Sequence, residues 1–259
     1  MNKISVAERV PDEPMVPDVA KVRFAGHIDS RRVISKDEFP LALWRHELSP
    51  GASIRLESPQ EDHTFYVVEG EILVGGNPVP AKGAASIGAH AISEIRGGAT
   101  GATVLHYIGY APTRPDKPGG CVHILSQAWV EHTPHSAHGL YLDSSCPSCS
   151  VWLHMTWGDK TRLTHPHYHT EDEIICVIDG EMGFGTTAIA PGGAIGVGKD
   201  VIYSFTRSED KGLGFINFRQ ADPFFLPKGK KPEEAESERV LMRGLLQRLS
   251  EERLQGARP

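Results

Sequence analysis

The stretch that decides the fold is THPHYHTEDEIICVIDGE, residues 164–181. It places His165, His167 and His169 at alternate positions, and Glu173 follows four residues after the last of them. Alternate side chains of an extended strand point to one face, so His167 and His169 can direct two imidazoles at one point. Glu173, at the start of the next predicted strand, can add a carboxylate. This donor set suits a divalent metal ion that keeps open positions for water and substrate.

The spacing His167-x-His169-x3-Glu173-x6-Gly180 resembles the first motif of the cupins, a family of small β-barrels. The resemblance implies a barrel of antiparallel strands with the metal near its mouth. In the family's usual pattern, a second motif supplies a histidine as the fourth ligand. In this sequence Tyr203 stands at the position of that histidine. The resemblance therefore implies three metal ligands, and a phenol occupies the fourth position.

Composition excludes several classes of protein. The net charge of -6 and pI near 6.1 argue against nucleic acid as a partner, because phosphate binding needs a basic face. No apolar run approaches the roughly 20 residues of a membrane-spanning helix, and the start lacks the apolar core of a signal peptide. We therefore expect a cytoplasmic protein without nucleic-acid or membrane partners. The glycines form no dinucleotide-binding fingerprint.

The pattern of turn glycines and strand residues repeats after 110 residues, which indicates a tandem duplication. Short runs rich in β-branched and aromatic residues, with turn signals between them, favour an all-β fold. The residue pairs that coincide under the shift are Val67 and Val177, Gly70 and Gly180, Glu71 and Glu181, Gly75 and Gly185, Gly83 and Gly193, Gly88 and Gly198, and Ile92 and Ile202. Trp44-x-His46 also repeats as Trp152-x-His154 at a slightly different offset.

The predicted fold is all-β: two tandem cupin barrels, of the double-stranded β-helix or jelly-roll type, plus a C-terminal α-helix. The expected domains are an N-terminal arm (1–24), an N-terminal barrel (25–115), a C-terminal barrel (116–227) and a helix with tail (228–259). The helix is expected over Glu233 to Gln255, where helix formers are dense. Its apolar stripe, on which the helix would pack against its own barrel or a dimer mate, consists of Leu241, Leu245, Leu246 and Leu249.

The duplication predicts that only the C-terminal barrel binds metal. Under the shift, Pro59 stands at the position of His169, and proline has no side-chain donor atom. The first barrel keeps at most Glu57 and His63, in exchanged order, and His90 and Glu94 are the nearby residues that could rescue a site. We therefore expect one divalent metal ion per chain, with Fe first and Mn, Zn or Ni as alternatives.

Three residues near the motif have open roles. Tyr203 is a phenolate ligand, a neutral hydrogen-bond donor or acid beside the metal, or a plain aromatic residue; its ordinary pKa near 10 favours the neutral phenol. His165 shares the strand parity of the ligands and is expected just behind them or at the surface; the alternatives are that it lines the mouth of the cavity or replaces a ligand. His154 is expected to be structural, with a place in the cavity wall as the alternative, because its Trp-x-His pattern also occurs in the barrel without the metal motif.

Of the four cysteines, Cys121, Cys146, Cys149 and Cys176, the last three are interpreted as structural. Cys146 and Cys149 form a lone C-x-x-C, which supplies half of a zinc site, and the sequence shows no second pair of this kind. We expect a turn between strands there, and Cys176 as a small core residue.

The function expected from the resemblance is that of a metal-dependent bicupin enzyme acting on a small polar organic substrate, most simply an Fe(II)-type dioxygenase or oxidoreductase. A non-redox lyase, isomerase or amidohydrolase is the alternative, and a non-catalytic small-molecule-binding cupin is the third possibility. A homodimer is expected, since cupin barrels commonly associate through sheet edges.

Overall fold

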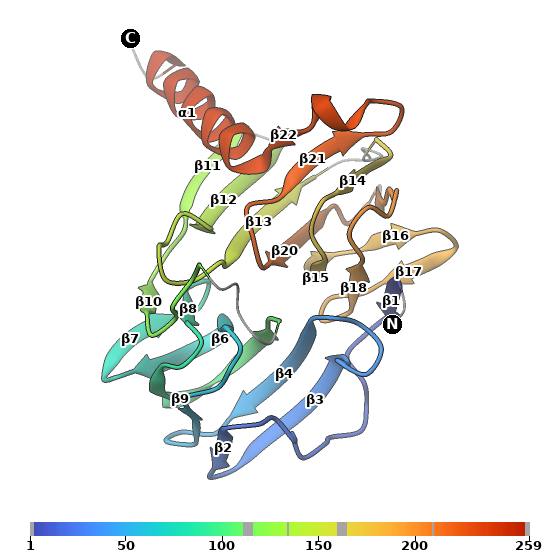
Figure 1. The fold of residues 1–259 in the computed structure, drawn as a ribbon. Helices are drawn as coiled ribbons and strands as arrows, with labels where there is room; N and C mark the ends of the chain where they lie inside the picture. The colour runs from blue at the N-terminus through green and yellow to red at the C-terminus, as the bar shows by residue number, and fades with distance from the viewer. Residues whose placement is uncertain (1–2, 111–115, 134, 160–164, 209, 257–259) are drawn as a thin grey trace.

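A computed structural model describes residues 3–110, 116–133, 135–159, 165–208 and 210–256, apart from the side chains at positions 232 and 252–256. Antiparallel strands form two barrels, one above the other in Figure 1, and one α-helix, α1 (Glu238–Gly256), lies at the outer end of the second. The predicted fold class is confirmed. No helix in the described part of the chain is long and apolar enough to cross a membrane.

The N-terminal barrel is built on a nine-stranded sheet, in which β6 and β9 form the longest pairing. Its strands are β2 (Val22–Ala25), β3 (Ile28–Ile34), β4 (Ala42–Leu48), β5 (Ser53–Glu57), β6 (His63–Val74), β7 (Asn77–Pro80), β8 (Ala84–Ile87), β9 (Ile92–Ile108) and β10 (Val122–Leu125).

The C-terminal barrel has a seven-stranded sheet in the order β1-β18-β15-β20-β13-β12-β11 and two three-stranded sheets, β14-β21-β22 and β17-β16-β19. The strands are β1 (Ile4–Ala7), β11 (Trp129–Thr133), β12 (Ser136–Asp143), β13 (Trp152–Gly158), β14 (His167–His169), β15 (Glu173–Gly180), β16 (Met182–Phe184), β17 (Thr187–Ile189), β18 (Ala194–Val197), β19 (Thr206–Arg207), β20 (Leu213–Arg219), β21 (Phe224–Pro227) and β22 (Glu236–Ser237).

The two barrels exchange strands. β1, from the N-terminal arm, pairs with β18 of the C-terminal barrel, and it appears in dark blue among the orange strands of Figure 1. β10, which the expected boundary at 115/116 assigns to the second barrel, pairs with β8 of the first. Each barrel is therefore completed by a strand that the chain supplies from outside its own contiguous segment.

The repeat predicted from the sequence is confirmed by the turns. Gly70 and Gly180 both have positive φ, +72° and +70°. A Cβ atom at either position would collide with a backbone carbonyl oxygen, that of Gly101 in the first barrel and that of Gly212 in the second. The two turns need glycine for the same two reasons, a left-handed backbone and a close approach of another chain segment.

Backbone hydrogen bonds repeat with the same shift. Val67 N donates to Gly83 O at 2.9 Å, and Val177 N donates to Gly193 O at 2.9 Å. The buried carboxylate of Asp62 accepts from Ala89 N, and that of Asp172 accepts from Lys199 N, both at 2.8 Å. The duplication thus extends to individual atoms.

The Trp-x-His pattern does not follow this register. Trp44 lies opposite His106, whereas His154 lies opposite Asn217. His106 and Asn217 are equivalent positions, because they pair with Phe65 and Ile175, which are 110 residues apart. The counterpart of Trp44 is therefore His154, and the two Trp-x-His patterns do not superpose.

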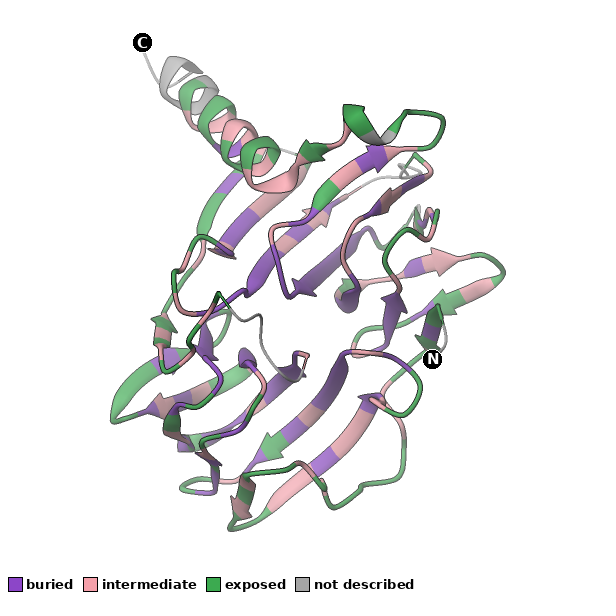
Figure 2. Ribbon diagram, in the orientation of Figure 1, coloured by how far each residue is buried: buried purple, intermediate pink, exposed green. Residues whose placement is uncertain are grey.

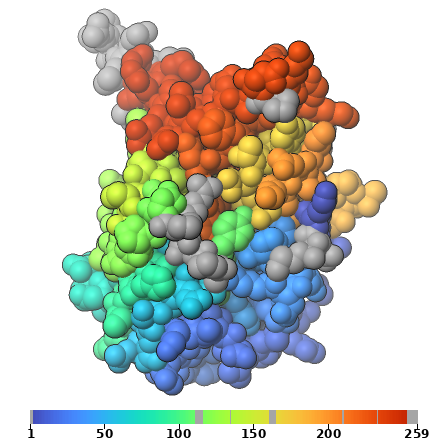
Figure 3. All heavy atoms as spheres, viewed as in Figure 1, coloured from blue at the N-terminus to red at the C-terminus, as the bar shows by residue number. Residues whose placement is uncertain are grey.

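A shared hydrophobic core joins the barrels. One cluster combines buried residues of both halves, and the rings of Tyr107 and Phe218 stack across it at 5.0 Å. Cys176 is fully buried in this cluster and acts as a small apolar residue. The buried segments fill the region between the barrels in Figure 2, and the space-filling view in Figure 3 shows the two halves in close contact.

The C-terminal helix begins later than predicted. Positions 232–234 form a short 3-10 helix and β22 follows, so α1 begins at Glu238 rather than Glu233. The helix packs on β11 and β12 of its own barrel. Leu246 is fully buried against Leu140 and Trp152, while Leu241 is 37% exposed, so only part of the predicted stripe makes the contact.

Candidate functional site

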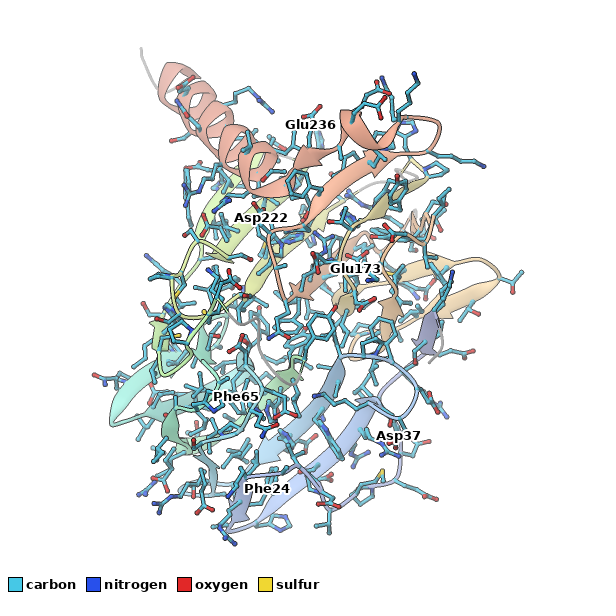
Figure 4. All side chains as sticks on the ribbon, in the orientation of Figure 1. Phe24, Asp37, Phe65, Glu173, Asp222 and Glu236 are labelled. Atoms are coloured by element: carbon cyan, nitrogen blue, oxygen red, sulfur yellow. The ribbon has the colours of Figure 1, made fainter. Side chains whose placement is uncertain are left out.

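The structure brings four predicted residues together at one end of the C-terminal barrel. His167 and His169 lie on β14, and Glu173 begins β15 (Figure 4). His167 and Tyr203 form an isolated β-bridge, with their rings 4.6 Å apart. All four side chains are buried: their exposed fractions are 7%, 3%, 1% and 6% for His167, His169, Glu173 and Tyr203.

Both imidazoles have the tautomer and charge of metal ligands. His167 Nδ1 lies 2.7 Å from the carbonyl oxygen of His165, so Nδ1 carries the proton and Nε2 keeps its lone pair. His169 Nε2 lies 3.1 Å from a guanidinium nitrogen of Arg219, which can only donate, so this Nε2 also presents a lone pair. Burial lowers the pKa of both imidazoles, which keeps them neutral.

Arg219, at the end of β20, is the main residue that the sequence analysis missed. Its guanidinium is 2% exposed and donates to Glu173 Oε2 from Nε at 3.0 Å and from Nη2 at 2.6 Å. Asn217 Nδ2 donates to the same oxygen at 2.7 Å, and Arg219 Nη1 donates to Glu238 at the start of α1. The signal was present in LGFINFR, where Asn217 and Arg219 alternate within an otherwise apolar strand.

The environment holds Glu173 ionised. Burial alone would raise the pKa of this carboxyl, but the charge of Arg219 and the bonds from Tyr203 and Asn217 bring it down to about 2. Glu173 Oε1 is buried, has no hydrogen-bond partner among the described residues, and lies 3.9 Å from His169 Nε2. An unpartnered carboxylate oxygen that faces an imidazole lone pair is an arrangement that a cation stabilises.

These residues suit a divalent metal ion in donor type, tautomer and charge, but their donor atoms do not all lie within 4.8 Å of one another. The cation that the structure places against them is the Arg219 guanidinium, whose Nη2 contacts both His169 and Glu173. A metal ion shared by these two ligands would take over the contacts of Nη2. Glu238 already binds the opposite side of the guanidinium and could retain it. A metal ion at this place would therefore compete with Arg219 Nη2 for His169 and Glu173.

Tyr203 remains a neutral phenol. Burial and the charge of Glu173 raise its pKa well above 10. Its hydroxyl hydrogen-bonds with Glu173, one of the contacts that stabilise the ionised carboxylate. This environment favours a hydrogen-bond donor over a phenolate ligand.

The segment that follows β20 covers the mouth of the site. β21 pairs with β14, and the ring of Phe225 lies 5.0 Å from that of His167 and 5.7 Å from that of His169. Glu238 Oε1 lies 3.7 Å from His169 Nδ1. An aromatic ring and a carboxylate from the end of the chain therefore separate the histidines from solvent.

The two additional candidates lie outside this group. His165 is exposed and contributes only its backbone carbonyl to His167. His154 is buried and accepts a hydrogen bond from Trp152 Nε1 at 2.7 Å. It lies opposite Asn217 on the neighbouring strand, and burial lowers its pKa to about 3. His154 therefore lies beside Asn217, the residue that donates to Glu173, and has a supporting role.

The first barrel contains a chain of buried histidines at the corresponding place. His106 hydrogen-bonds through Nδ1 with His46 Nε2 at 3.1 Å and through Nε2 with His63 Nδ1 at 2.8 Å. His46 Nδ1 also lies 2.8 Å from Ser30 Oγ. Phe65, labelled in Figure 4, stacks on His106 with ring centroids 4.2 Å apart. Burial lowers the pKa of all three imidazoles, and those of His46 and His63 fall to about 3. They form a neutral hydrogen-bonded core.

The other residues considered for the first barrel face outward. Glu57 pairs with Arg23 at 2.7 Å, and Glu94 pairs with Arg96 at 2.7 Å. His90 is exposed, with φ at +65°. None of these side chains lies beside the buried His63.

The cysteines have neighbours that the sequence did not indicate. Cys146 and Cys149 lie in the connection between β12 and β13, as expected, but Cys121 and His123 provide a second pair. The donor atoms of the four lie within 4.8 Å of one another, the only such group among the described residues. The signal was Cys121-x-His123, which the sequence analysis did not combine with the C-x-x-C.

Comparisons with known proteins identify the architecture of the chain. A scan of protein-family models finds no match. A search of the curated proteins finds none either. Among solved structures, the chain is similar to oxalate decarboxylase in a study of proton-coupled electron transfer, with 12% identity and a TM-score of 0.63 over 88% of this chain and 79% of that one.

Two further structures give the same result. A point mutant of Bacillus subtilis oxalate decarboxylase has 12% identity and a TM-score of 0.61, over 84% of this chain and 82% of that one. Protein Ylba from E. coli has 11% identity and a TM-score of 0.61, over 85% of this chain and 91% of that one. At such low identity these likenesses establish the architecture, and the chain has the two-barrel cupin fold.

Proposed function

We propose that this protein is a metal-dependent cupin enzyme that acts on a small polar organic molecule in its C-terminal barrel. The observation that carries the proposal is the pair of neutral, buried imidazoles, His167 and His169, of which His169 Nε2 lies 3.9 Å from the ionised Glu173. The first barrel has Pro59 and His63 at two of these three positions, so the donor set is specific to one half of the chain.

His167, His169 and Glu173 would hold the metal, which would supply a Lewis acid and, if it is redox-active, a place to bind O₂. Tyr203 keeps its proton, which it now directs at Glu173, and could donate it to a substrate oxygen instead once the carboxylate binds the metal. Arg219 contributes positive charge beside the ligands, and Phe225 excludes water from the histidines.

We place an oxidative reaction first, because two imidazoles and one carboxylate with open positions are typical of Fe(II) oxygenases. The buried guanidinium of Arg219 supports a non-redox lyase or isomerase as the second candidate, since a fixed cation stabilises negative charge that develops on a substrate. Small carboxylates belong in the first substrate panel for the same reason. Oxalate, named in the structural neighbours, is one of them.

Metal analysis of purified variants tests the proposal. His167→Ala and Glu173→Gln should each lose the Fe, Mn or Ni found in the wild type, and Glu57→Ala, in the first barrel, should retain it. Zinc is counted separately because the cysteine cluster is a second possible metal site. Retention of the metal after His167→Ala would place it elsewhere and refute the assignment.

The reaction class requires activity measurements with the metal-loaded protein. Oxygen uptake with a panel of small carboxylates and carbonyl compounds identifies an oxidative enzyme. Turnover of the same compounds without oxygen uptake identifies the non-redox class. Tight binding of a compound with no turnover under either condition would favour a binding protein.

We also propose a homodimer. β11 is an edge strand that exposes Trp129 and Val130 at 47% and 40%, and the neighbouring helix exposes Val240 at 69%. An apolar patch at a strand edge is a typical association surface. A monomeric mass in light scattering at micromolar concentration would contradict this proposal.

A further inference from the structure

Cys121, His123, Cys146 and Cys149 converge from two distant parts of the chain. Their sulfur and nitrogen donor atoms all lie within 4.8 Å of one another, and Cys149 is fully buried. None of the four cysteines in the chain forms a disulfide. This convergence does not involve the site of the C-terminal barrel.

The strand side of the cluster is set by β10. Cys121 directly precedes this strand and His123 is its second residue, so both side chains point to one face. Gly88 N donates to the carbonyl oxygen of Cys121 at 2.8 Å. A Cβ atom at Gly88 would lie 2.7 Å from Cys121 Sγ, so the glycine leaves room for the sulfur.

The loop side is a tight turn that presents two sulfurs. Cys146 and Cys149 flank Pro147 and Ser148, and Ser148 N donates to Cys146 Sγ at 3.3 Å. Gly119 N donates to Ser148 O at 2.8 Å, which holds the turn against the segment that leads into β10. Lys117 Nζ donates to the carbonyl oxygen of Cys146 and brings a positive charge close to the sulfurs.

The geometry suits zinc. Tetrahedral Zn²⁺ with bonds of about 2.3 Å to sulfur and about 2.0 Å to nitrogen separates these two donors by about 3.5 Å. Cys149 Sγ and His123 Nε2 are 3.5 Å apart. Three cysteines and one histidine are a complete ligand set for a structural zinc site, and four protein ligands leave no position for substrate.

We infer that Cys121, His123, Cys146 and Cys149 bind one structural Zn²⁺ ion that fastens the two barrels together. β10 belongs to the sheet of the N-terminal barrel, and the loop with Cys146 and Cys149 joins two strands of the C-terminal sheet. The ion therefore links the exchanged strand to the opposite barrel. The inference is independent of the metal proposed for His167, His169 and Glu173.

Zinc analysis with matched variants tests the inference. The wild type, purified without a metal-binding tag, should contain about one zinc ion per chain in this site. Cys149→Ser and His123→Ala should lose it, and Cys176→Ser, which changes a core cysteine outside the cluster, should retain it. His123→Cys should restore zinc binding, because four thiolates also form a tetrahedral zinc site.

Two measurements on the wild type avoid variants that fail to fold. A mercurial reagent that blocks thiols should release the zinc into a colorimetric chelator, and Co²⁺ in its place should show the intense visible bands of tetrahedral thiolate coordination. Removing the zinc should also lower the midpoint of thermal unfolding. Zinc-free protein with four titratable thiols, or a Cys146–Cys149 disulfide in the mass spectrum, would overturn the inference, as would full zinc retention in Cys149→Ser.

Discussion

Arg219 and Glu173 form an ion pair that is almost completely buried, with Nη2 and Oε2 2.6 Å apart and exposed fractions of 2% and 1% for the two side chains. The pair lies among the residues that we propose as metal ligands, and Nη2 also contacts His169. The C-terminal barrel therefore contains a protein-supplied cation among its predicted metal ligands. Competition between guanidinium and metal gives the first prediction.

Arg219→Met should destabilise the metal-free protein by about 3–5 kcal/mol, because it leaves Glu173 as an uncompensated buried charge. Added Mn²⁺ should then raise the unfolding midpoint more in the variant than in the wild type, since the metal no longer displaces Nη2. Urea unfolding with and without Mn²⁺ measures both effects. Arg9→Met, which removes an exposed pair with Asp12, is the control and should cost less than about 1 kcal/mol. Equal Mn²⁺ effects in variant and wild type would rule out the competition.

Tyr203→Phe should retain the metal and lose most of the turnover. The phenol is neutral, and its proton lies next to Glu173, so its removal takes away a donor without removing a ligand. Loss of one such positioned donor lowers kcat by roughly 10²-fold or more. Metal content and steady-state kinetics check the two parts. Loss of the metal in Tyr203→Phe would instead identify the tyrosine as a ligand.

Acid should destabilise the first barrel through its histidine chain. The pKa of His46 and that of His63 are lowered by burial to about 3 in the folded state, below the ordinary 6.5. Between these values the unfolded state binds more protons, so this stability is present above pH 6.5 and is lost as the pH falls toward 3. Each such imidazole adds about 1.4 kcal/mol per pH unit to the slope.

Urea unfolding between pH 7 and pH 5 checks this slope; Glu173, whose pKa falls from the ordinary 4.5 to about 2 on folding, contributes little in this range. His63→Gln should reduce the slope by about one proton. His27→Gln changes an exposed residue and should leave the slope as it is. An unchanged slope in His63→Gln would contradict the burial of a neutral imidazole at this position.

Gly70→Ala and Gly180→Ala should be similarly damaging, because both positions combine positive φ with a backbone oxygen in the place of the new Cβ. We expect losses of more than about 2 kcal/mol for each, beyond the roughly 1 kcal/mol of an unfavourable φ alone. Gly75→Ala is the control: its φ is +56° and nothing lies within 4 Å of the added atom. Thermal unfolding compares the three variants. A loss at only one of the two equivalent turns would contradict their structural equivalence.

The sequence alone was sufficient to predict features that depend on the alternation within one strand or on the internal repeat. Alternation within HPHYH predicts that His167 and His169 share a face, and the shift of 110 residues predicts the paired turns at Gly70 and Gly180. The residues that contact Glu173 in the site could not be predicted from alternation or from the repeat. Arg219 reaches Glu173 through the register of β15 with β20, which depends on how two strands distant in sequence align.

The cysteine cluster shows the same limit more clearly. Cys146 and Cys149 are visible as a motif, but Cys121 and His123 join them only because β10 pairs with β8 and returns beside the loop. The start of α1 was missed for a different reason. Helix propensity is high from Glu233, but the pairing of β22 with β21 keeps positions 236 and 237 extended until Glu238.

The reciprocal pairing of β1 with β18 and of β10 with β8 has a consequence for the ancestry and folding of the chain. A gene for either half alone would encode a barrel with an unprotected edge, whose missing strand resides in the other half. The arrangement corresponds to that of two single-barrel subunits that exchange their leading strands, here joined in one polypeptide. We expect such a molecule to unfold as one cooperative unit, and its halves, expressed separately, to recover structure only when mixed.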